Sequence, residues 1–323
     1  MNETKTYICD APERLDTFLA SRIAKSRSQI AQLIKKECVY VEDKIVSRSG
    51  VKLKENQTVK VEFPELKTNP PLDINFDVEI LYEDDDVLVI NKPTDLTVHP
   101  APSVKEATLV DWLKHKDIRL STLSGEERHG IVHRLDKGTS GAMIIAKNDE
   151  AHEFLSLQLQ DKSMGRYYLA VVNPPLKEDL TLIECPIARS MHNRLKMACL
   201  EHGKYAKTLF YTLALSKDEK NQLLACKLFT GRTHQIRVHL ESINRHIIGD
   251  CIYAQNPKAE NTERILLHAY MIYFIHPRSK EKLSFIALPD KQMVKYLENK
   301  FNMEKINEVI DPSYIVRGFA TRY

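Results

Sequence analysis

The sequence contains no apolar run that approaches the length of a membrane-spanning helix. Its first residues, 1–5, lack the apolar core of a secretory signal. The six cysteines are scattered and form no Cys-x-x-Cys pair, so the sequence indicates neither a zinc site nor a disulfide framework. We therefore expect a soluble cytoplasmic protein with no membrane partner, and oligomeric state remains open.

Two further absences exclude chemistries that short motifs would otherwise suggest. The string His133-Arg134-Leu135-Asp136 is similar to the His-Arg-Asp loop of protein kinases, but a leucine separates its arginine from its aspartate. No Asp-Phe-Gly, G-x-G-x-x-G or phosphate-binding P-loop accompanies it. His234 and His239 are five residues apart, whereas paired metal ligands on a helix need a spacing of four. We expect no metal site.

Positive charge is concentrated near the start of the chain. The whole sequence has 47 Lys and Arg against 44 Asp and Glu, a surplus too small to identify a partner. Residues 14–60, however, carry eleven basic side chains against five acidic ones. Such a face can displace counterions from phosphates. The predicted RNA-binding side chains are Arg22, Lys25, Arg27, Lys35, Lys36 and Lys44.

The same region resembles a known RNA-binding module. Arg14-Leu15-Asp16-x-Phe18-Leu19 is followed by Ser26-Arg27-Ser28-Gln29-Ile30 and then by Val39-Tyr40-Val41-Glu42-Asp43-Lys44. This order resembles the RNA-binding domain of ribosomal protein S4, the alpha-L motif. We therefore expect such a domain over residues 13–63, a proline-containing linker over 64–74, a catalytic domain over 75–298 and a C-terminal tail over 299–323.

Residues 130–147 contain the first cluster of candidate catalytic residues. Two apolar runs, Ile131-Val132 and 142–146, predict strands on either side of a polar turn. Gly138 and Gly141 give that turn conformational freedom, and the turn presents Arg134 and Asp136. A carboxylate supported by two strand ends has the rigidity that a catalytic group needs.

A second cluster covers residues 229–240. Ile236, Leu240 and Ile243 share one helical face, which predicts a helix capped by Thr233 with Arg237 in its first turn. Between the two clusters, residues 185–199 form a basic strip.

These motifs together resemble a family of enzymes. His-Arg-Leu-Asp-Lys-Gly-Thr-Ser-Gly, residues 133–141, resembles the catalytic motif of RluA-type pseudouridine synthases and most closely that of their RluD-like branch. Asn-Lys-Pro at 91–93, Arg-x-Tyr at 166–168 and Gly-Arg-Thr-His-Gln-Ile-Arg-Val-His at 231–239 match further family motifs in the expected order. The resemblance implies an α+β fold: a mixed, largely antiparallel sheet with flanking helices, preceded by the small α/β RNA-binding module.

The resemblance also implies roles for individual residues. Asp136 would be the catalytic carboxylate, and Arg237 would keep it ionised. Tyr168 would pack on the target uracil and take part in removal of the C5 proton. Arg134 would fill the space that the flipped base leaves, and Leu267 would line the apolar side. Whether Asp136 attacks the sugar or removes a sugar proton stays open. No cofactor is expected, because the reaction is an isomerisation.

The motifs also bear on the identity of the RNA substrate. The RluD-like motifs favour uridines of large-subunit (23S) ribosomal RNA. The alternatives are the same chemistry on transfer RNA and a non-catalytic RNA-binding or ribosome-assembly factor. Asp136, Tyr168 and Arg237 argue against the last, since a protein that only binds RNA needs no carboxylate beside an arginine.

Overall fold

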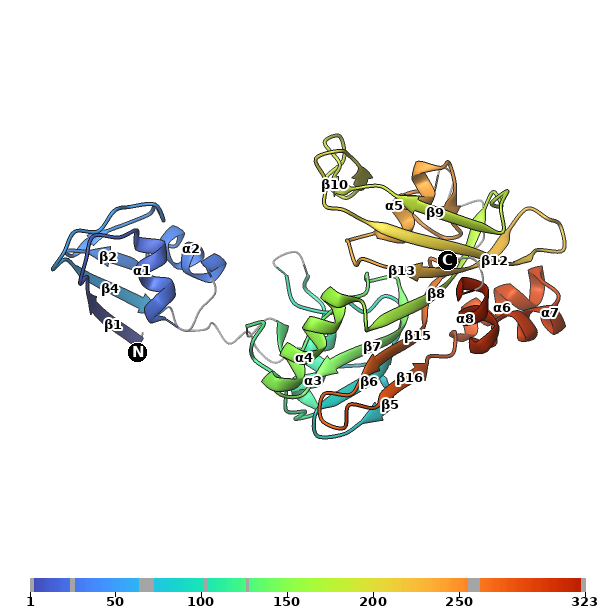
Figure 1. Ribbon diagram of the computed structural model, residues 1–323, viewed down its shortest axis with the longest axis horizontal. Coiled ribbons are helices and arrows are strands. Elements are labelled where there is room, and N and C mark those ends of the chain that lie inside the picture. Colours follow the sequence, from blue (N-terminus) through green and yellow to red (C-terminus); the bar gives the residue numbers. More distant parts are fainter. Residues whose placement is uncertain are drawn as a thin grey trace. The chain divides into compact units, whose positions relative to one another are not determined.

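The chain folds into two units, residues 1–72 and 73–323, each with its own hydrophobic core (Figure 1). A computed structural model describes residues 3–23, 27–63, 73–101, 104–125, 128–254 and 262–320. Among these residues, no helix is both long and apolar enough to cross a bilayer. The predicted linker lies mostly outside the described residues.

The N-terminal unit packs two helices on one face of a small sheet. Phe18 and Ile30 from the helices meet Val59 and Val61 of the sheet, and all four are fully buried. The first strand pairs with the last and adds residues 3–8 to the sheet of this unit. The elements are β1 (Glu3–Ile8), α1 (Leu15–Arg22), α2 (Arg27–Lys35), β2 (Val39–Val41), β3 (Lys44–Ile45) and β4 (Thr58–Phe63), with sheet order β1-β4-β2-β3.

The second unit is built on a ten-stranded sheet with the order β5-β6-β7-β15-β8-β13-β12-β9, to which β14 and β16 add at β8 and β15. Every pairing is antiparallel except that of β7 with β15. This confirms the predicted mixed, largely antiparallel sheet. The strands are β5 (Glu79–Glu83), β6 (Val87–Lys92), β7 (Ser140–Ala146), β8 (Gly165–Asn173), β9 (Leu180–Glu184), β12 (Lys207–Leu215), β13 (Gln222–Leu228), β14 (His246–Ile247), β15 (Leu267–Ile275) and β16 (Lys282–Ile286).

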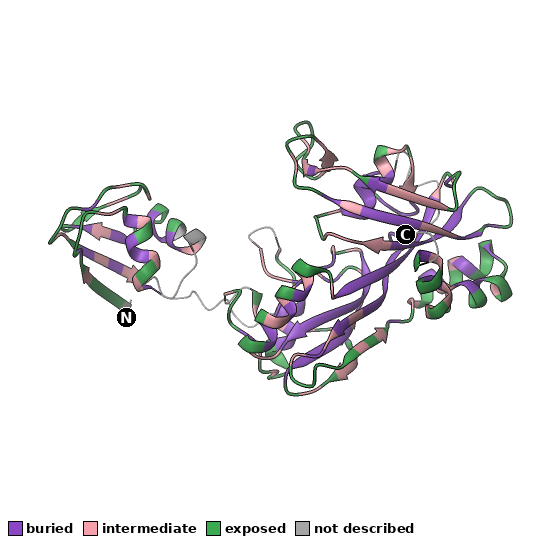
Figure 2. Cartoon of the chain, viewed as in Figure 1, coloured by how far each residue is buried: buried purple, intermediate pink, exposed green. Residues whose placement is uncertain are grey.

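Successive side chains of β8 face two different cores, and the strand is buried along most of its length (Figure 2). Tyr168 and Ala170 face a core shared with α3 (Leu109–His115) and α5 (Gln235–Ser242). Tyr167 and Leu169 face the opposite core. Both faces of the strand are buried, so its sequence is a continuous apolar run that gives no hint of which face holds the site. A further helix, α4 (Asp149–Asp161), packs beside β7 and β15.

Residues 299–320 are not a tail, and this prediction was wrong. They continue from α6 (Lys291–Lys300) into α7 (Met303–Val309) and α8 (Pro312–Ala320). Phe301, Ile306 and Phe319 are buried in the core under β8, β12 and β13. Without these side chains, one face of the sheet would expose its apolar residues to water.

Two local predictions also need correction. Ile131 makes only an isolated bridge to Ile145, because the chain turns at Gly130 (φ +68°) instead of extending. The N-cap of α5 is His234 and not Thr233, and His234 adopts a left-handed conformation with φ 57° and ψ 21°.

The basic strip forms a hairpin of β10 (Ile187–Arg189) and β11 (Met197–Cys199).

Candidate active site

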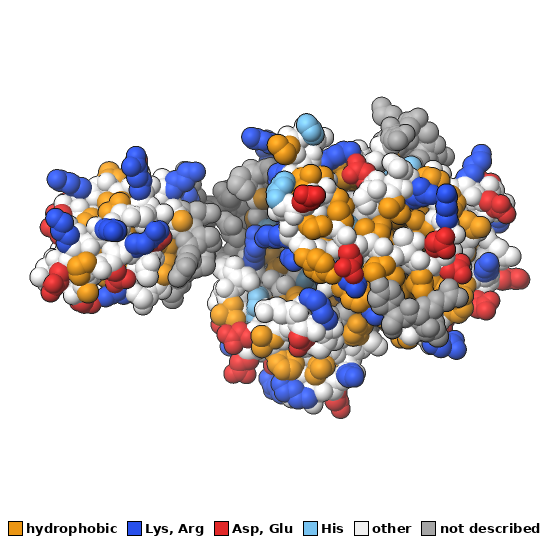
Figure 3. All heavy atoms as spheres, turned by 45° about the horizontal axis from the view of Figure 1, so that its top comes forward, with side chains coloured by type: hydrophobic (Ala, Val, Ile, Leu, Met, Phe, Trp, Pro, Cys, Tyr) orange, Lys and Arg blue, Asp and Glu red, His pale blue; other side chains and the backbone are white. Residues whose placement is uncertain are grey.

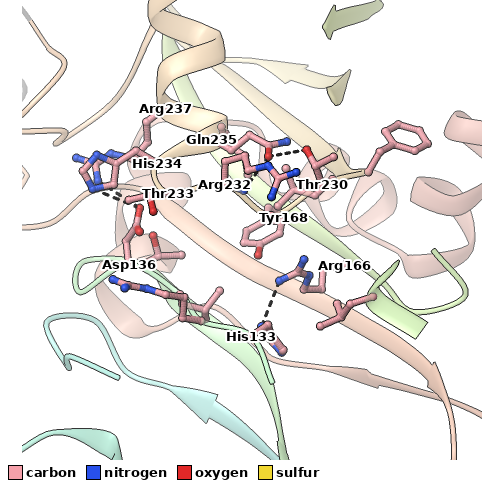
Figure 4. A pocket seen from close by; sticks show the side chains of 18 of the residues that line it. His133, Asp136, Arg166, Tyr168, Thr230, Arg232, Thr233, His234, Gln235 and Arg237 are labelled. Carbon is pink, nitrogen blue, oxygen red and sulfur yellow. Dashed lines mark hydrogen bonds and ion pairs between the residues drawn. The ribbon is translucent and has the colours of Figure 1, made fainter. Parts of the chain in front are cut away.

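A cavity of about 460 Å³ lies where the two motif clusters meet (Figure 4). Its walls come from the loop before β7, the start of β8 and the segment leading into α5. Five residues predicted from the sequence as catalytic or substrate-binding line this one cavity, although they come from four separate stretches of chain. They are Arg134, Asp136, Tyr168, Arg237 and Leu267.

Asp136 is held beside Arg237. Nη1 of Arg237 donates to Oδ2 of Asp136 at 3.3 Å, and the Asp136 side chain is 20% exposed toward the cavity. The other nitrogens of the same guanidinium, Nε and Nη2, each donate to Asp250 at 2.7 Å. The bidentate pair sets the plane of the arginine, and that plane determines where the arginine meets Asp136.

Asp250 is buried and is itself fixed by the backbone. Its Oδ1 accepts hydrogen bonds from the N–H groups of Ile252 and Tyr253 at 3.0 and 3.1 Å. Burial works against the charge of Arg237, but the hydrogen bonds to Asp250 outweigh it and raise the pKa of Arg237 above its ordinary value. The arginine is therefore a permanent cation next to Asp136.

His234 and Tyr253 complete this side of the cavity. Nε2 of His234 lies 4.0 Å from Oδ2 of Asp136, and its Nδ1 shares a hydrogen bond of 2.9 Å with the Tyr253 hydroxyl. That hydroxyl also accepts the N–H of Met197 at 2.8 Å, which ties β11 to the site. Burial lowers the pKa of His234, so the ring is neutral at neutral pH.

Tyr168 points into the cavity from β8 and is 4% exposed (Figure 4). Burial raises the pKa of its hydroxyl, while the nearby Arg166 lowers it. The phenol is therefore protonated at neutral pH and offers a flat apolar ring to a bound base.

Lys92 supports the loop that carries Asp136. Its buried Nζ donates to the carbonyl oxygens of Pro93 and Leu96 at 2.8 Å and to that of Lys137 at 3.2 Å. Burial lowers the pKa of Lys92 to about 7. These bonds join the Asn-Lys-Pro motif to the residue that follows Asp136, which explains why the two motifs occur together.

The predicted RNA-binding side chains of the N-terminal unit differ in their surroundings. Lys35, Lys36 and Lys44 are exposed, and Figure 3 shows Lys and Arg side chains over the visible face of this unit. Arg22 is half-buried, covers the Phe18 ring at 4.0 Å and pairs with Asp10 and Glu13. Lys25 lies outside the described residues, as does the side chain of Arg27.

Comparison with known proteins shows which family the chain belongs to. Residues 86–242 match the RNA pseudouridylate synthase family, and residues 13–59 match the S4 domain. An uncharacterised RNA pseudouridine synthase of Helicobacter pylori is 46% identical over 317 residues, covering 96% of this chain and 97% of that protein. The chain belongs to the RNA pseudouridine synthase family. Members of this family isomerise uridine in RNA, and the RluA/RluD type with an N-terminal S4 domain is the one that this chain matches.

Other relatives differ in what their names state. The ribosomal large subunit pseudouridine synthase D of Zymomonas mobilis is 37% identical over 308 residues, covering 91% of this chain and 94% of that protein. The solved structure of human RNA pseudouridylate synthase domain containing 1 shares the fold. It has a TM-score of 0.58 and 21% identity, and the match covers 75% of this chain and 98% of that one.

Several residues at this site of the synthase were missed by reasoning from the sequence. Asp250 and Tyr253 were not predicted as site residues. His234 was excluded as a metal ligand and belongs to the family motif at 231–239, but no role was predicted for it, whereas it contacts Asp136 and Tyr253. A search for a buried acid able to pair with Arg237 could have found Asp250, because buried guanidinium groups need partners.

Proposed function

We propose that this synthase converts uridines of large-subunit ribosomal RNA to pseudouridine, with Asp136 as the catalytic residue. One observation carries the proposal: the carboxylate of Asp136 lines the cavity, and Nη1 of Arg237, whose guanidinium is fixed by Asp250, lies 3.3 Å from its Oδ2. The large-subunit target is supported by the name of the Zymomonas mobilis relative. Action on ribosomal RNA would take place in the cytoplasm.

The geometry supports a division of work among the lining residues. Asp136 acts on the sugar of the target nucleotide, either by attack at C1′ or by removal of the C2′ proton. Tyr168 packs against the flipped uracil and assists loss of the C5 proton, and Leu267 covers an apolar side of the cavity. Arg134 occupies the place that the base leaves in the RNA. The exposed lysines of the S4 domain contact phosphates.

Mapping of pseudouridines in cells with and without the gene tests the proposal. We expect particular sites to disappear from 23S RNA and to return when the wild-type gene is restored. Loss of sites from transfer RNA alone would contradict the ribosomal target but keep the chemistry. Complementation of the cells without the gene by an Asp136→Asn gene distinguishes an enzyme from a non-catalytic assembly factor. Only a protein that works without catalysis would then restore growth and ribosome profiles.

A further inference from the structure

Arg166 is a buried cation in the cavity wall, and the proposed function gives it no role. It lies two residues before Tyr168 on β8, so both side chains project from the same face of the strand. Arg166 is only 8% exposed, and it lines the cavity between Tyr168 and His133 (Figure 4).

The guanidinium of Arg166 has only neutral partners among the described residues, the His133 ring and the Tyr168 hydroxyl. Nη1 donates to Nδ1 of His133 at 3.2 Å, whereas Nε is buried without a hydrogen-bond partner. Among the described residues, no carboxylate pairs with it. Burial and the Arg166 charge hold the pKa of His133 well below its ordinary value, so His133 cannot supply negative charge. Burial of a cation without a negatively charged partner is unfavourable, and a ligand that brought negative charge would relieve this.

Space for this cation is provided by Gly231. A Cβ at that position would lie 3.2 Å from Nη2 of Arg166, a tight contact. Gly231 also lines the cavity. The second motif cluster thus leaves room for Arg166 beside the place where a base would sit.

The isomerisation creates negative charge in this cavity. When the N1–C1′ bond breaks, its electron pair stays on the uracil, which becomes an anion with charge on its carbonyl oxygens. The sugar either bonds to the Asp136 carboxylate or gives that carboxylate its C2′ proton. C5 then forms a bond to C1′ with an electron pair of the base: on the first route this displaces the Asp136 carboxylate from C1′, and on the second the carboxylic acid of Asp136 returns its proton to C2′. C5 then loses its proton and N1 gains one. No external reagent is needed, and the anion exists on either route.

We propose that Arg166 is a further catalytic residue, whose guanidinium binds a carbonyl oxygen of the target uracil and stabilises the uracil anion while the base is detached. This inference rests on the proposed function. Because Arg166 lies deep in the cavity, we expect it to bind the base and not a phosphate. The side chain of Asp136, which must reach the sugar, is 20% exposed, and Arg166 is less exposed than that. Arg232, an exposed residue of the cavity rim, is better placed for the RNA backbone.

The test compares full-length wild-type protein with Arg166→Met and Arg166→Lys in single-turnover assays at saturating RNA. Removal of one preorganised donor from a developing negative charge costs about a hundred- to thousandfold in rate. We expect such a loss for Arg166→Met, an intermediate rate for Arg166→Lys, and RNA affinity that changes less than threefold. Arg278→Met is the matched control, since it removes a positive charge far from the cavity, where Arg278 pairs with Asp86.

Two measurements separate this role from a structural one. Replacement of an unpaired buried cation by an apolar side chain should leave the melting temperature unchanged or raise it. In addition, RNA with 5-fluorouridine at the target position carries a base that is a better leaving group. 5-Fluorouridine has no C5 proton to lose, so its product keeps fluorine on the C5 that is bonded to C1′. Formation of this product, followed by chromatography of digested RNA, should therefore show a smaller defect for Arg166→Met than conversion of uridine does.

Several results would overturn the inference. Equal rates for wild type and Arg166→Met would remove Arg166 from the reaction. A loss of affinity together with a shallower salt dependence would identify a phosphate contact instead. A lower melting temperature with the same defect on both substrates would identify a structural role. Failure of the proposed function would look different, because the wild-type protein itself would then form no pseudouridine.

Discussion

The hydrogen bond from Arg237 to Asp136 is 3.3 Å long, clearly longer than the 2.7 Å bonds that the same guanidinium makes to Asp250. The arginine is therefore anchored on the side away from the cavity. Asp136 lies close to the positive charge of Arg237 but makes only one hydrogen bond with it, so a bidentate pair does not fix the position of the carboxylate. This arrangement places a positive charge beside the carboxylate and still leaves its oxygens available to a substrate.

Asp136→Asn should abolish pseudouridine formation while RNA affinity and melting temperature stay close to those of the wild type. The side chains have the same shape, but an amide is neither a nucleophile nor a base at neutral pH. Single-turnover assays at saturating RNA, combined with filter binding, check this expectation. Retention of a tenth of the wild-type rate would exclude Asp136 from the mechanism.

Arg237→Met should lower the single-turnover rate on the order of a hundredfold, because a misplaced carboxylate has a cost of this size. It also leaves Asp250 buried without its partner, so the free energy of unfolding should fall by about 3–5 kcal/mol. The double variant Arg237→Met/Asp250→Asn removes that stranded charge. It should recover part of the stability but none of the rate, which separates the catalytic effect from the structural one. If affinity falls and the rate stays, Arg237 binds phosphate instead.

Deletion of residues 1–72 should leave the catalytic unit folded, because the two units have separate hydrophobic cores. Binding to structured RNA should weaken, and the dependence of affinity on salt should become shallower as the phosphate contacts of the S4 domain are lost. Binding titrations at several salt concentrations measure both quantities. Identical slopes with and without the domain would mean that its lysines only face solvent.

His268 predicts a pH dependence of stability. Burial is the main cause that lowers its pKa from 6.5 to about 4 in the folded protein. Between these values the unfolded chain binds a proton that the folded protein does not, so stability should fall as the pH drops from 6.5 to 4. The contribution approaches about 1.4 kcal/mol per pH unit.

Urea unfolding can follow this effect through Trp112, the single tryptophan, which is buried in the catalytic unit. His268→Gln loses hydrogen bonds to Ser140 and to the carbonyl of Ala287, so its stability should be lower at every pH. Its slope between pH 6.5 and 4 should nevertheless be smaller than that of the wild type. Parallel slopes would show that another group accounts for the pH dependence.

The sequence was most informative where chemistry depends on short motifs. Asp136 and Arg237 are 101 residues apart, yet family motifs identified both, and the structure brings them together. Asp250 and Tyr253 were not predicted as site residues, because their roles arise from tertiary contacts that leave no local pattern in the sequence. Apolar positions such as Ile306 and Val309 lie three apart and fit a helical face, but without a known counterpart this signal in residues 299–320 was overlooked.

The separate core of the S4 unit has a consequence for how such enzymes diversify. Among the described residues, its buried apolar side chains form a cluster distinct from those of the second unit, so changes there do not alter the hydrophobic core of the catalytic unit. Mutations that alter which RNA is bound can therefore accumulate without risk to the isomerisation chemistry. A lineage can acquire a new target by remodelling or exchanging this one domain, and an engineer can attempt the same by grafting another RNA-binding domain ahead of residue 73.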